Sequence, residues 1–392
     1  PVAVPLAAVA QGGGAPAACL AAMRAARLGP AYPADVLACT EAEPDAPAWQ
    51  AARGAAILAL LRDDAEGLAA TEAGGVTVIR PDLPPGTLIP VTGRAGVIPG
   101  RGVPAIWRPA PGTAGPDEPP EGRPEPLALT AAIDRTGGRS TVTIRAVRRA
   151  ELRRGGWTNA AGAAYLRLAE TARLEESARI GFIDPGELAS HREGVYLIEP
   201  YDPDRIPLVM IHGLRSSPGT WRTLTLSVLT DPELHRRFQV WHVFYPTGLP
   251  PFYSAAGVRS GLRAVLARHD PSGRALPSRR MAVVGHSMGG IVARILVTED
   301  RGQIWRTSFT VPPEALDVPP DRAAALRSIL TLTREPQIGF AAFVDTPHRG
   351  ALLAAGPIGQ FASSLVRLPM SFATLFSDDA GFVAQVTPAL RP

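Results

Sequence analysis

The stretch that decides the fold is Met281-Ala-Val-Val-Gly-His-Ser-Met-Gly-Gly-Ile-Val-Ala-Arg294. Four apolar residues of strand length lead into Gly-x-Ser-x-Gly, and a stretch of helical length, 288–299, follows. This context predicts a nucleophile elbow, in which a tight turn forces Ser287 into strained dihedrals and projects its hydroxyl above the sheet. Gly285 and Gly289 are expected there because a Cβ at either position would collide with the neighbouring strand or helix. The alternative is a glycine-rich turn that opens an ordinary strand–helix unit.

A second apolar strand, Ile206 to Ile211, ends in His212-Gly213-Leu214. Glycine lets the backbone turn so that the next amide points into a site. Acyl transfer needs two N–H donors on the developing oxyanion, and the pattern predicts the backbone amides of Leu214 and Met288 for this role. Any tight turn can contain His-Gly, so it is the downstream elbow that favours the oxyanion role.

Strand-length apolar runs alternate with helix-length stretches through the second half of the chain. The apolar runs are 195–198, 207–211, 240–245, 281–284 and 338–344, and the helical stretches are 219–237, 254–269 and 288–299. This alternation predicts an α/β domain over 191–392, a mostly parallel sheet with helices on both faces. We interpret an insertion at 301–336 as a cap over the site. The alternative is a helical excursion packed on the sheet.

Residues 1–190 are expected to form an N-terminal mixed α+β region of helices and short strands, whose role the sequence does not indicate. The Pro/Gly-rich segment 109–126 cannot build a core and is interpreted as a loop or linker. An arginine-rich stretch at 145–154 is interpreted as a solvated face.

Composition limits the class of protein. The 392 residues suffice for two domains, and 46% hydrophobic with 19% charged residues excludes a wholly disordered chain. No stretch reaches the roughly 18 apolar residues that a transmembrane helix needs. The net charge is +4 without any lysine, and the one dense group of arginines, at 145–154, is interpreted as a solvated face, so nucleic acid is not an expected partner. Neither a metal-ligand spacing nor a phosphate loop occurs, so no metal or cofactor is expected.

The compartment stays open on sequence grounds. Cys19 and Cys39 are the two cysteines, and they can form one bridge in an oxidising compartment. Residues 1–10 are similar to the remnant of a signal h-region, although they contain prolines and no basic n-region precedes them. Export, envelope association and a cytoplasmic location all remain compatible.

Several motifs, in this order, carry a family resemblance. They are Glu199 to Leu214, Ser216-Ser-Pro-Gly-Thr-Trp221, Phe244-Tyr-Pro-Thr-Gly248, Gly285-His-Ser-Met-Gly-Gly290 and Thr346-Pro-His-Arg-Gly350. Together they resemble bacterial α/β-hydrolase serine esterases and lipases over roughly residues 190 to 350. The resemblance implies the α/β-hydrolase fold, Ser287 as nucleophile, and a small-molecule or lipid ester as substrate. In that fold the catalytic residues follow the order Ser, acid, His.

The acid and the base have no clear match. His348 is the one histidine after Ser287, and in the resembled family its motif lies near the site while the base comes later. Asp345 is a candidate acid by its position after a strand. His348 is a weak candidate base that we interpret as a packing residue, and His212 and His286 are poor candidates. We therefore expect a sheet truncated at the C-terminus and a fragment with little activity.

Two other functions stay open. An acyltransferase or thioesterase of the same fold would use the same acyl-enzyme, because pocket shape chooses the acceptor. A non-catalytic binding module of this fold is favoured if a longer chain also lacks an acid and a histidine.

Overall fold

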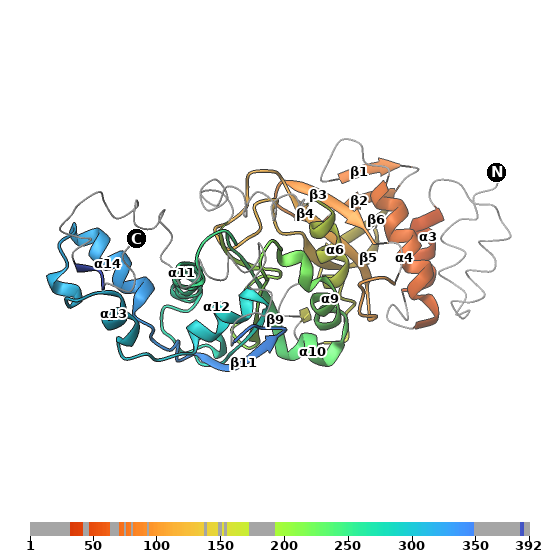
Figure 1. Ribbon diagram of the computed structural model, residues 1–392. Helices are drawn as coiled ribbons and strands as arrows, with labels where there is room; N and C mark the ends of the chain where they lie inside the picture. Colours follow the sequence, from red (N-terminus) through yellow and green to blue (C-terminus); the bar gives the residue numbers. More distant parts are fainter. Residues whose placement is uncertain are drawn as a thin grey trace. The chain divides into compact units, whose positions relative to one another are not determined.

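The computed structural model places much of the chain in two compact units (Figure 1). The described residues are 32–41, 47–62, 70–73, 76–79, 81–91, 94–136, 139–147, 151–152, 155–171, 193–348 and 385–387. Unit 1 comprises Pro1–Ala114 and Glu121–Leu168, and unit 2 comprises Gly115–Pro120 and Ala169–Pro392. The boundary predicted at residue 190 lies outside the described residues.

Unit 1 contains a six-stranded sheet with the order β1-β2-β6-β5-β4-β3. Its strands are β1 (Ala70–Ala73), β2 (Val76–Ile79), β3 (Gly86–Pro90), β4 (Val103–Pro109), β5 (Glu125–Thr136) and β6 (Arg139–Ala146). Neighbouring strands are antiparallel except β2 and β6, which are parallel. Helices α3 (Tyr32–Cys39) and α4 (Pro47–Arg62) share a buried apolar cluster with the sheet. The next residue of β4 after that cluster, Ile106, packs instead with alanines at the start of α6 (Ala161–Thr171).

The 12-residue strand β5 lies in the centre of this sheet, and the sequence analysis did not predict it. Its sequence is rich in alanine, which has a low β propensity. Pairing with both β4 and β6 places Leu129 and Ala131 in the core. Long-range pairing therefore overrides the local preference. Cys39, at the end of α3, is disulfide-bonded, as is typical of oxidising compartments, and Cys19 lies outside the described residues.

Unit 2 contains a five-stranded sheet with the order β11-β10-β8-β9-β7. Its strands are β7 (Gly194–Leu197), β8 (Ile206–Ile211), β9 (Phe238–Phe244), β10 (Met281–His286) and β11 (Ile338–Val344). The pairs β11–β10, β10–β8 and β8–β9 are parallel, and β7 runs antiparallel to β9. Among the described strands β11 lies at one edge, and its Phe340 side chain is 65% exposed. The predicted mostly parallel sheet is confirmed.

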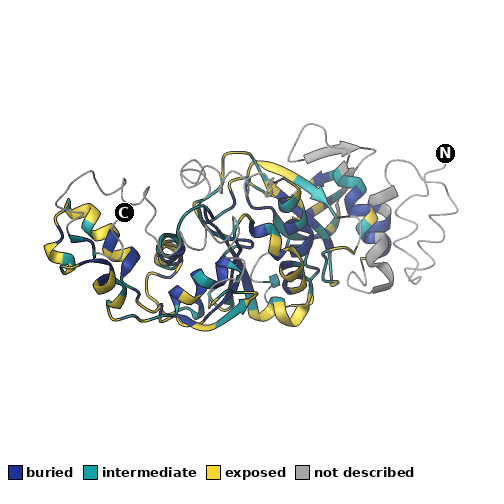
Figure 2. Ribbon diagram, viewed as in Figure 1, coloured by how far each residue is buried: buried dark blue, intermediate teal, exposed yellow. Residues whose placement is uncertain are grey.

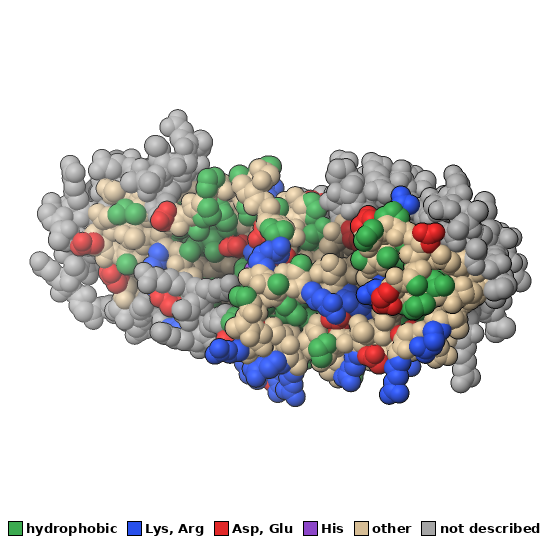
Figure 3. Space-filling view, turned by 90° about the vertical axis from the view of Figure 1, so that its left-hand side faces the viewer, with side chains coloured by type: hydrophobic (Ala, Val, Ile, Leu, Met, Phe, Trp, Pro, Cys, Tyr) green, Lys and Arg blue, Asp and Glu red, His purple; other side chains and the backbone are tan. Residues whose placement is uncertain are grey.

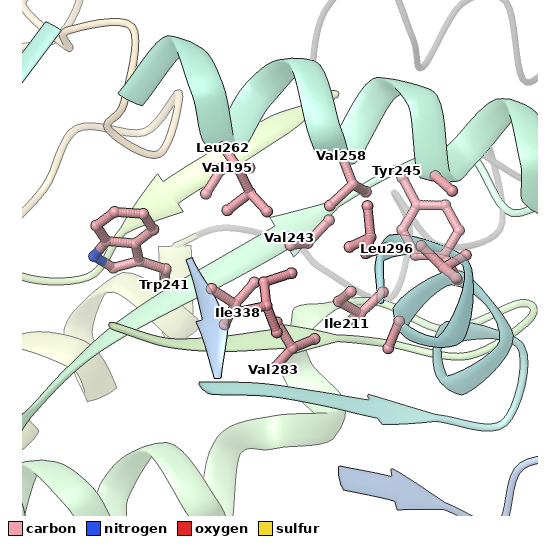
Figure 4. Close-up of a cluster of buried hydrophobic side chains, with 14 of the residues drawn as sticks. Val195, Ile211, Trp241, Val243, Tyr245, Val258, Leu262, Val283, Leu296 and Ile338 are labelled. Carbon is pink, nitrogen blue, oxygen red and sulfur yellow. The ribbon is translucent and has the colours of Figure 1, made fainter. Parts of the chain in front are cut away.

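Helices cover both faces of this sheet, as the sequence predicts. On one face, α11 (Pro251–His269) and α12 (Met288–Leu296) bury apolar side chains against the strands (Figure 4). On the other face lie α9 (Arg222–Thr230) and α10 (Pro232–Arg237), where Thr225 contacts Met210 and His242. Parallel strands packed on both faces are expected to be apolar throughout, and β9 and β10 are buried along most of their length (Figure 2).

The helical stretch predicted over 219–237 is divided into three pieces. A 3₁₀ turn, η1 (Pro218–Trp221), precedes α9, and Asp231 separates α9 from α10. The Asp231 carboxylate accepts hydrogen bonds from the N–H groups of Glu233 and Leu234, and Pro232 occupies the first helical position. This N-cap with its proline starts a new helix, because proline has no N–H to continue the previous one.

The central part of the predicted linker, Gly115–Pro120, packs within unit 2. The buried Asp117 carboxylate contacts Arg268 and His269 at the end of α11, with 2.8 Å to His269 Nε2. The Asp117 carbonyl also accepts a hydrogen bond from the N–H of Leu197. The predicted loop therefore covers 110–124, because Pro109 ends β4 and Glu125 begins β5, and its centre is fixed to the parallel-sheet unit.

The insertion at 301–336 has a small core of its own. It contains α13 (Gln303–Ser308), the 3₁₀ turn η3 (Pro313–Ala315) and α14 (Pro320–Leu330). Trp305, Phe309 and Leu326 pack there with Val386 and with Phe252 of α11. Glu335 N–H bonds to the Leu296 carbonyl, so the insertion returns to the sheet at the C-terminal end of α12. Its role as a cap stays a prediction.

The described helices include none that is both long and apolar enough to cross a bilayer. Within the described ranges, no three His, Cys, Asp or Glu side chains are grouped as metal ligands would be.

A buried ionic network joins the amino ends of β8 and β9. Arg205 lies 3.0 Å from the Glu199 carboxylate and 3.3 Å from that of Asp202, and His235 Nε2 lies 2.8 Å from Glu199. Burial opposes the charge on Glu199, but Arg205 and His235 outweigh it and lower its pKa to about 2. The amide of Gln239 bonds to the carbonyls of Asp202 and Arg205. The network therefore fixes the turn before β8.

We expect Arg205→Gln to lower the free energy of unfolding by about 3 kcal/mol, because two buried carboxylates lose their cation. Arg236→Gln is the matched control, since its ion pair with Glu233 is exposed and should be worth about 0–1 kcal/mol. Urea unfolding of both variants measures the difference. Equal losses would show that the buried network does not stabilise the fold.

Candidate active site

Ser287 lies in the turn between β10 and α12, with φ 52° and ψ −120°. A left-handed backbone at a non-glycine residue costs about 1–3 kcal/mol, so the surroundings must hold it. Ser287 N–H donates to the Val344 carbonyl at 2.9 Å, and the Ser287 carbonyl accepts from Gly290 N–H at 3.0 Å. The strained turn is thus fixed on one side by β11 and on the other by α12.

Glycines let α12 approach the sheet at backbone contact. A Cβ on Gly285 would collide with the carbonyl of Gly289, and a Cβ on Gly289 would collide with the carbonyls of Ile211 and His212. The first turn of α12 therefore packs directly on the end of β8. A Cβ on Gly290 would collide with Thr346, so the segment after β11 also constrains this turn.

The loop after β8 passes beside the serine. A Cβ on Gly213 would lie 3.1 Å from Ser287 Cβ and 3.1 Å from Nδ1 of His286. Two buried side chains hold this loop: the Tyr245 hydroxyl donates to the His212 carbonyl at 2.7 Å, and Thr247 Oγ1 accepts from Arg215 N–H at 3.1 Å. The structure thus brings Gly213 and Ser287 together.

Three strained residues follow three neighbouring strands. Arg215, Ser287 and Asp345 have φ values of 53°, 52° and 47°, and they lie just beyond the carboxyl ends of β8, β10 and β11. These strands are adjacent in the order β11-β10-β8. Backbone strain gathers at functional sites, where the surrounding structure maintains it. The sequence analysis missed Arg215, because no local pattern marks a left-handed arginine.

Two backbone amides are available near the serine. Met288 is the first residue of α12, so its N–H has no acceptor within the helix. Leu214 follows Gly213, and its N–H makes no backbone hydrogen bond in the described loops. These are the two amides that the sequence analysis names as oxyanion donors.

The structure does not place the weak candidates for acid and base in a hydrogen-bonded triad. Asp345 is exposed after β11. The His348 ring packs edge-on against Phe343, with 4.9 Å between ring centroids. Within residues 193–348, His348 makes no side-chain hydrogen bond to Ser287 or Asp345.

Two histidines near the end of the sheet are buried and neutral at pH 7. His212 stacks on Tyr245 at 4.6 Å, and burial lowers its pKa to about 4. His242 shares a 2.8 Å hydrogen bond with Thr225, and burial, assisted by the nearby His212, lowers its pKa to about 3. His286 lies edge-on to Trp221 at 6.5 Å. His212 and His242 therefore act as packing residues.

Comparison with known proteins adds little to this geometry. No family model matches the chain, and no curated protein does. The crystal structure of Bacillus licheniformis lipase BlEst2 in its mature form is similar at 15% identity, with a TM-score of 0.25, over 49% of this chain and 68% of that one. Because this TM-score is low, any statement about function must come from the residues themselves.

The two buried histidines predict acid-sensitive stability. Each has a folded-state pKa well below its ordinary value of 6.5, so unfolding takes up protons as the pH falls below about 6.5. The contribution of these two histidines to the free energy of unfolding should be constant above that pH. The free energy of unfolding should fall as the pH decreases toward 4. His242→Gln keeps a partner for Thr225 and should reduce the slope by about half. Urea unfolding between pH 7.5 and 5 tests this, and an unchanged slope in the variant would contradict it.

Proposed function

We propose that this chain is a serine ester hydrolase of the α/β-hydrolase fold, with Ser287 as its nucleophile. The observation that carries the proposal is the left-handed Ser287 between β10 and α12, with Gly213 of the adjacent β8 loop beside it. The parallel order β11-β10-β8-β9 supports it, because a nucleophile elbow presents its serine at the carboxyl edge of such a sheet.

In this proposal Ser287 Oγ attacks the carbonyl carbon of an ester, and its proton passes to a base. The N–H groups of Leu214 and Met288 hydrogen-bond the oxyanion that forms, and the amino end of α12 adds a positive partial charge. The C–O bond to the alcohol breaks, the alcohol leaves with a proton, and an acyl-enzyme remains on Ser287. Water then attacks the acyl carbonyl, releasing the acid and restoring the hydroxyl.

The proton acceptor is the unassigned part of this mechanism. A serine hydroxyl is a weak nucleophile at neutral pH and needs a base within about 3 Å. Asp345 and His348 remain the weak candidates for acid and base in this chain, and the packing of His348 on Phe343 favours a packing role instead.

A fluorophosphonate probe should form a covalent adduct at Ser287, identified by mass spectrometry of the digested protein. Ser287→Ala should abolish labelling, whereas Ser328→Ala, on the exposed face of α14, should retain it. His348→Ala should change the labelling rate less than threefold if the ring only packs on Phe343. Labelling at another serine, or in Ser287→Ala, would reject Ser287 as nucleophile. Hydrolysis of p-nitrophenyl butyrate would support the hydrolase, whereas an adduct without hydrolysis would show a nucleophilic serine that does not turn over, as expected of a fragment with little activity.

Gly213→Val should lower the labelling rate at least tenfold, because its side chain would press on Ser287 and displace the Leu214 amide. Met288→Leu should keep most of the rate, since only its backbone N–H is used. A urea unfolding curve for each variant separates a displaced amide from a lost fold. A folded Gly213→Val protein with the wild-type rate would reject the Leu214 amide as an oxyanion donor.

A further inference from the structure

Exposed arginines gather at the amino edge of the sheet in unit 2. Arg236 and Arg237 directly precede β9, Arg279 and Arg280 directly precede β10, and Arg334 lies just before β11. Pairing places Phe238 beside Ile206 and Met281 beside Ile338, so these strand starts lie side by side. With about 4.8 Å between strands, the row from β9 to β11 spans about 15 Å.

Helix α12 contributes a sixth arginine to this edge. The chain reverses at Ser287, so α12 runs back along β10 and its last turn, with Arg294, lies near the strand starts. The hydrogen bond from Glu335 N–H to the Leu296 carbonyl brings Arg334 next to the same turn. We call this set the basic rim. It consists of Arg236, Arg237, Arg279, Arg280, Arg294 and Arg334, all of them exposed.

Nearby acids neutralise only part of the basic rim. Glu233 pairs with both Arg236 and Arg237. Exposed Asp204 and Glu299 also lie at this edge, and Glu299 accepts a hydrogen bond from the backbone N–H of Arg334. The buried Glu335 pairs with the buried Arg259 and with the exposed Arg263. Within the described residues, the guanidinium groups of Arg279, Arg280, Arg294 and Arg334 make no ion pair. The rim therefore carries a net positive charge that faces solvent. On the face drawn in Figure 3, basic side chains gather along the lower part.

Apolar side chains are exposed beside these arginines. Leu234, two residues before Arg236, is 36% exposed, and Phe340, near the start of β11, is 65% exposed. A guanidinium group can donate two parallel hydrogen bonds to the oxygens of one phosphate. Exposed apolar side chains near such groups are stabilised when they enter the boundary between lipid headgroups and acyl chains. Binding single-stranded nucleic acid would instead use aromatic side chains interleaved along a basic groove. From these observations we propose that the basic rim docks unit 2 onto a membrane that contains anionic phospholipid.

Docking in this way orients the rest of unit 2. Ser287 lies at the carboxyl edge of the same sheet, opposite the rim, and would face away from the membrane. If the proposed function holds, the ester substrate would then reach Ser287 from the aqueous side. The docking itself does not depend on that function.

Flotation with lipid vesicles tests the proposal on the full 392-residue chain. We expect binding to vesicles of phosphatidylcholine with 30% phosphatidylglycerol, no binding to phosphatidylcholine alone, and weaker binding as salt rises from about 50 to 300 mM. Arg279→Gln/Arg280→Gln should lower the partition coefficient at least tenfold. Arg222→Gln/Arg322→Gln removes the same charge from α9 and α14 and should change it less than twofold.

Three results would overturn the proposal. The first is no phosphatidylglycerol-dependent binding by the unmodified chain, and the second is an equal loss in both double variants. The third is tighter binding to a 20-base-pair DNA duplex than to the anionic vesicles in a competition assay, which would assign the rim to nucleic acid. Labelling of Ser287 by the fluorophosphonate probe should stay at the wild-type rate in the same variants. The docking proposal and the hydrolase proposal can therefore be rejected separately.

Discussion

Backbone contact between the first turn of α12 and the end of β8 is the constraint on which the rest of unit 2 depends. Without side chains at Gly285 and Gly289, helix and strands approach until carbonyl groups define the contact. The chain can then reverse only through a turn as tight as the one at Ser287, with its left-handed backbone. The same approach brings Gly213 alongside the serine. One packing distance thus sets the strain, the exposure of the serine and the position of the neighbouring loop.

The two edges of this sheet have opposite character. At the amino edge, charge and hydrogen bonding fix the turns: Arg205 joins Glu199 and Asp202, and Gln239 binds the carbonyls of the turn before β8. At the carboxyl edge, the turns are held in strained conformations by backbone bonds and by Tyr245 and Thr247. Ligands of parallel sheets bind at the carboxyl ends of the strands, where connecting loops meet. The buried ionic contacts and the strained turns therefore lie at different edges of the sheet.

Local patterns predicted the parts of this fold that depend on local physics. The apolar runs gave the strands of unit 2, and the glycine spacing around Ser287 gave the turn. Features that arise from distant pairing could not be predicted. Alanine-rich β5 becomes a strand only because β4 and β6 pair with it. Asp117 is fixed to α11 by Arg268 and His269, which lie 151 and 152 positions away. The left-handed Arg215 and Asp345 follow strands that neighbour β10, and a single sequence does not display this strand order.

Strain at Ser287 bears on the choice between an enzyme and a binding module. A non-catalytic turn between a strand and a helix has no need of a left-handed serine, because glycine adopts that backbone without the cost of a Cβ. Here the chain keeps glycine on either side, at Gly285 and Gly289, and places serine at the strained position itself. The glycines allow close packing of helix and strands. The serine adds backbone strain, and close packing does not require a serine at that position. In the proposed function, a hydroxyl used as a nucleophile would account for that cost, whichever group accepts its proton.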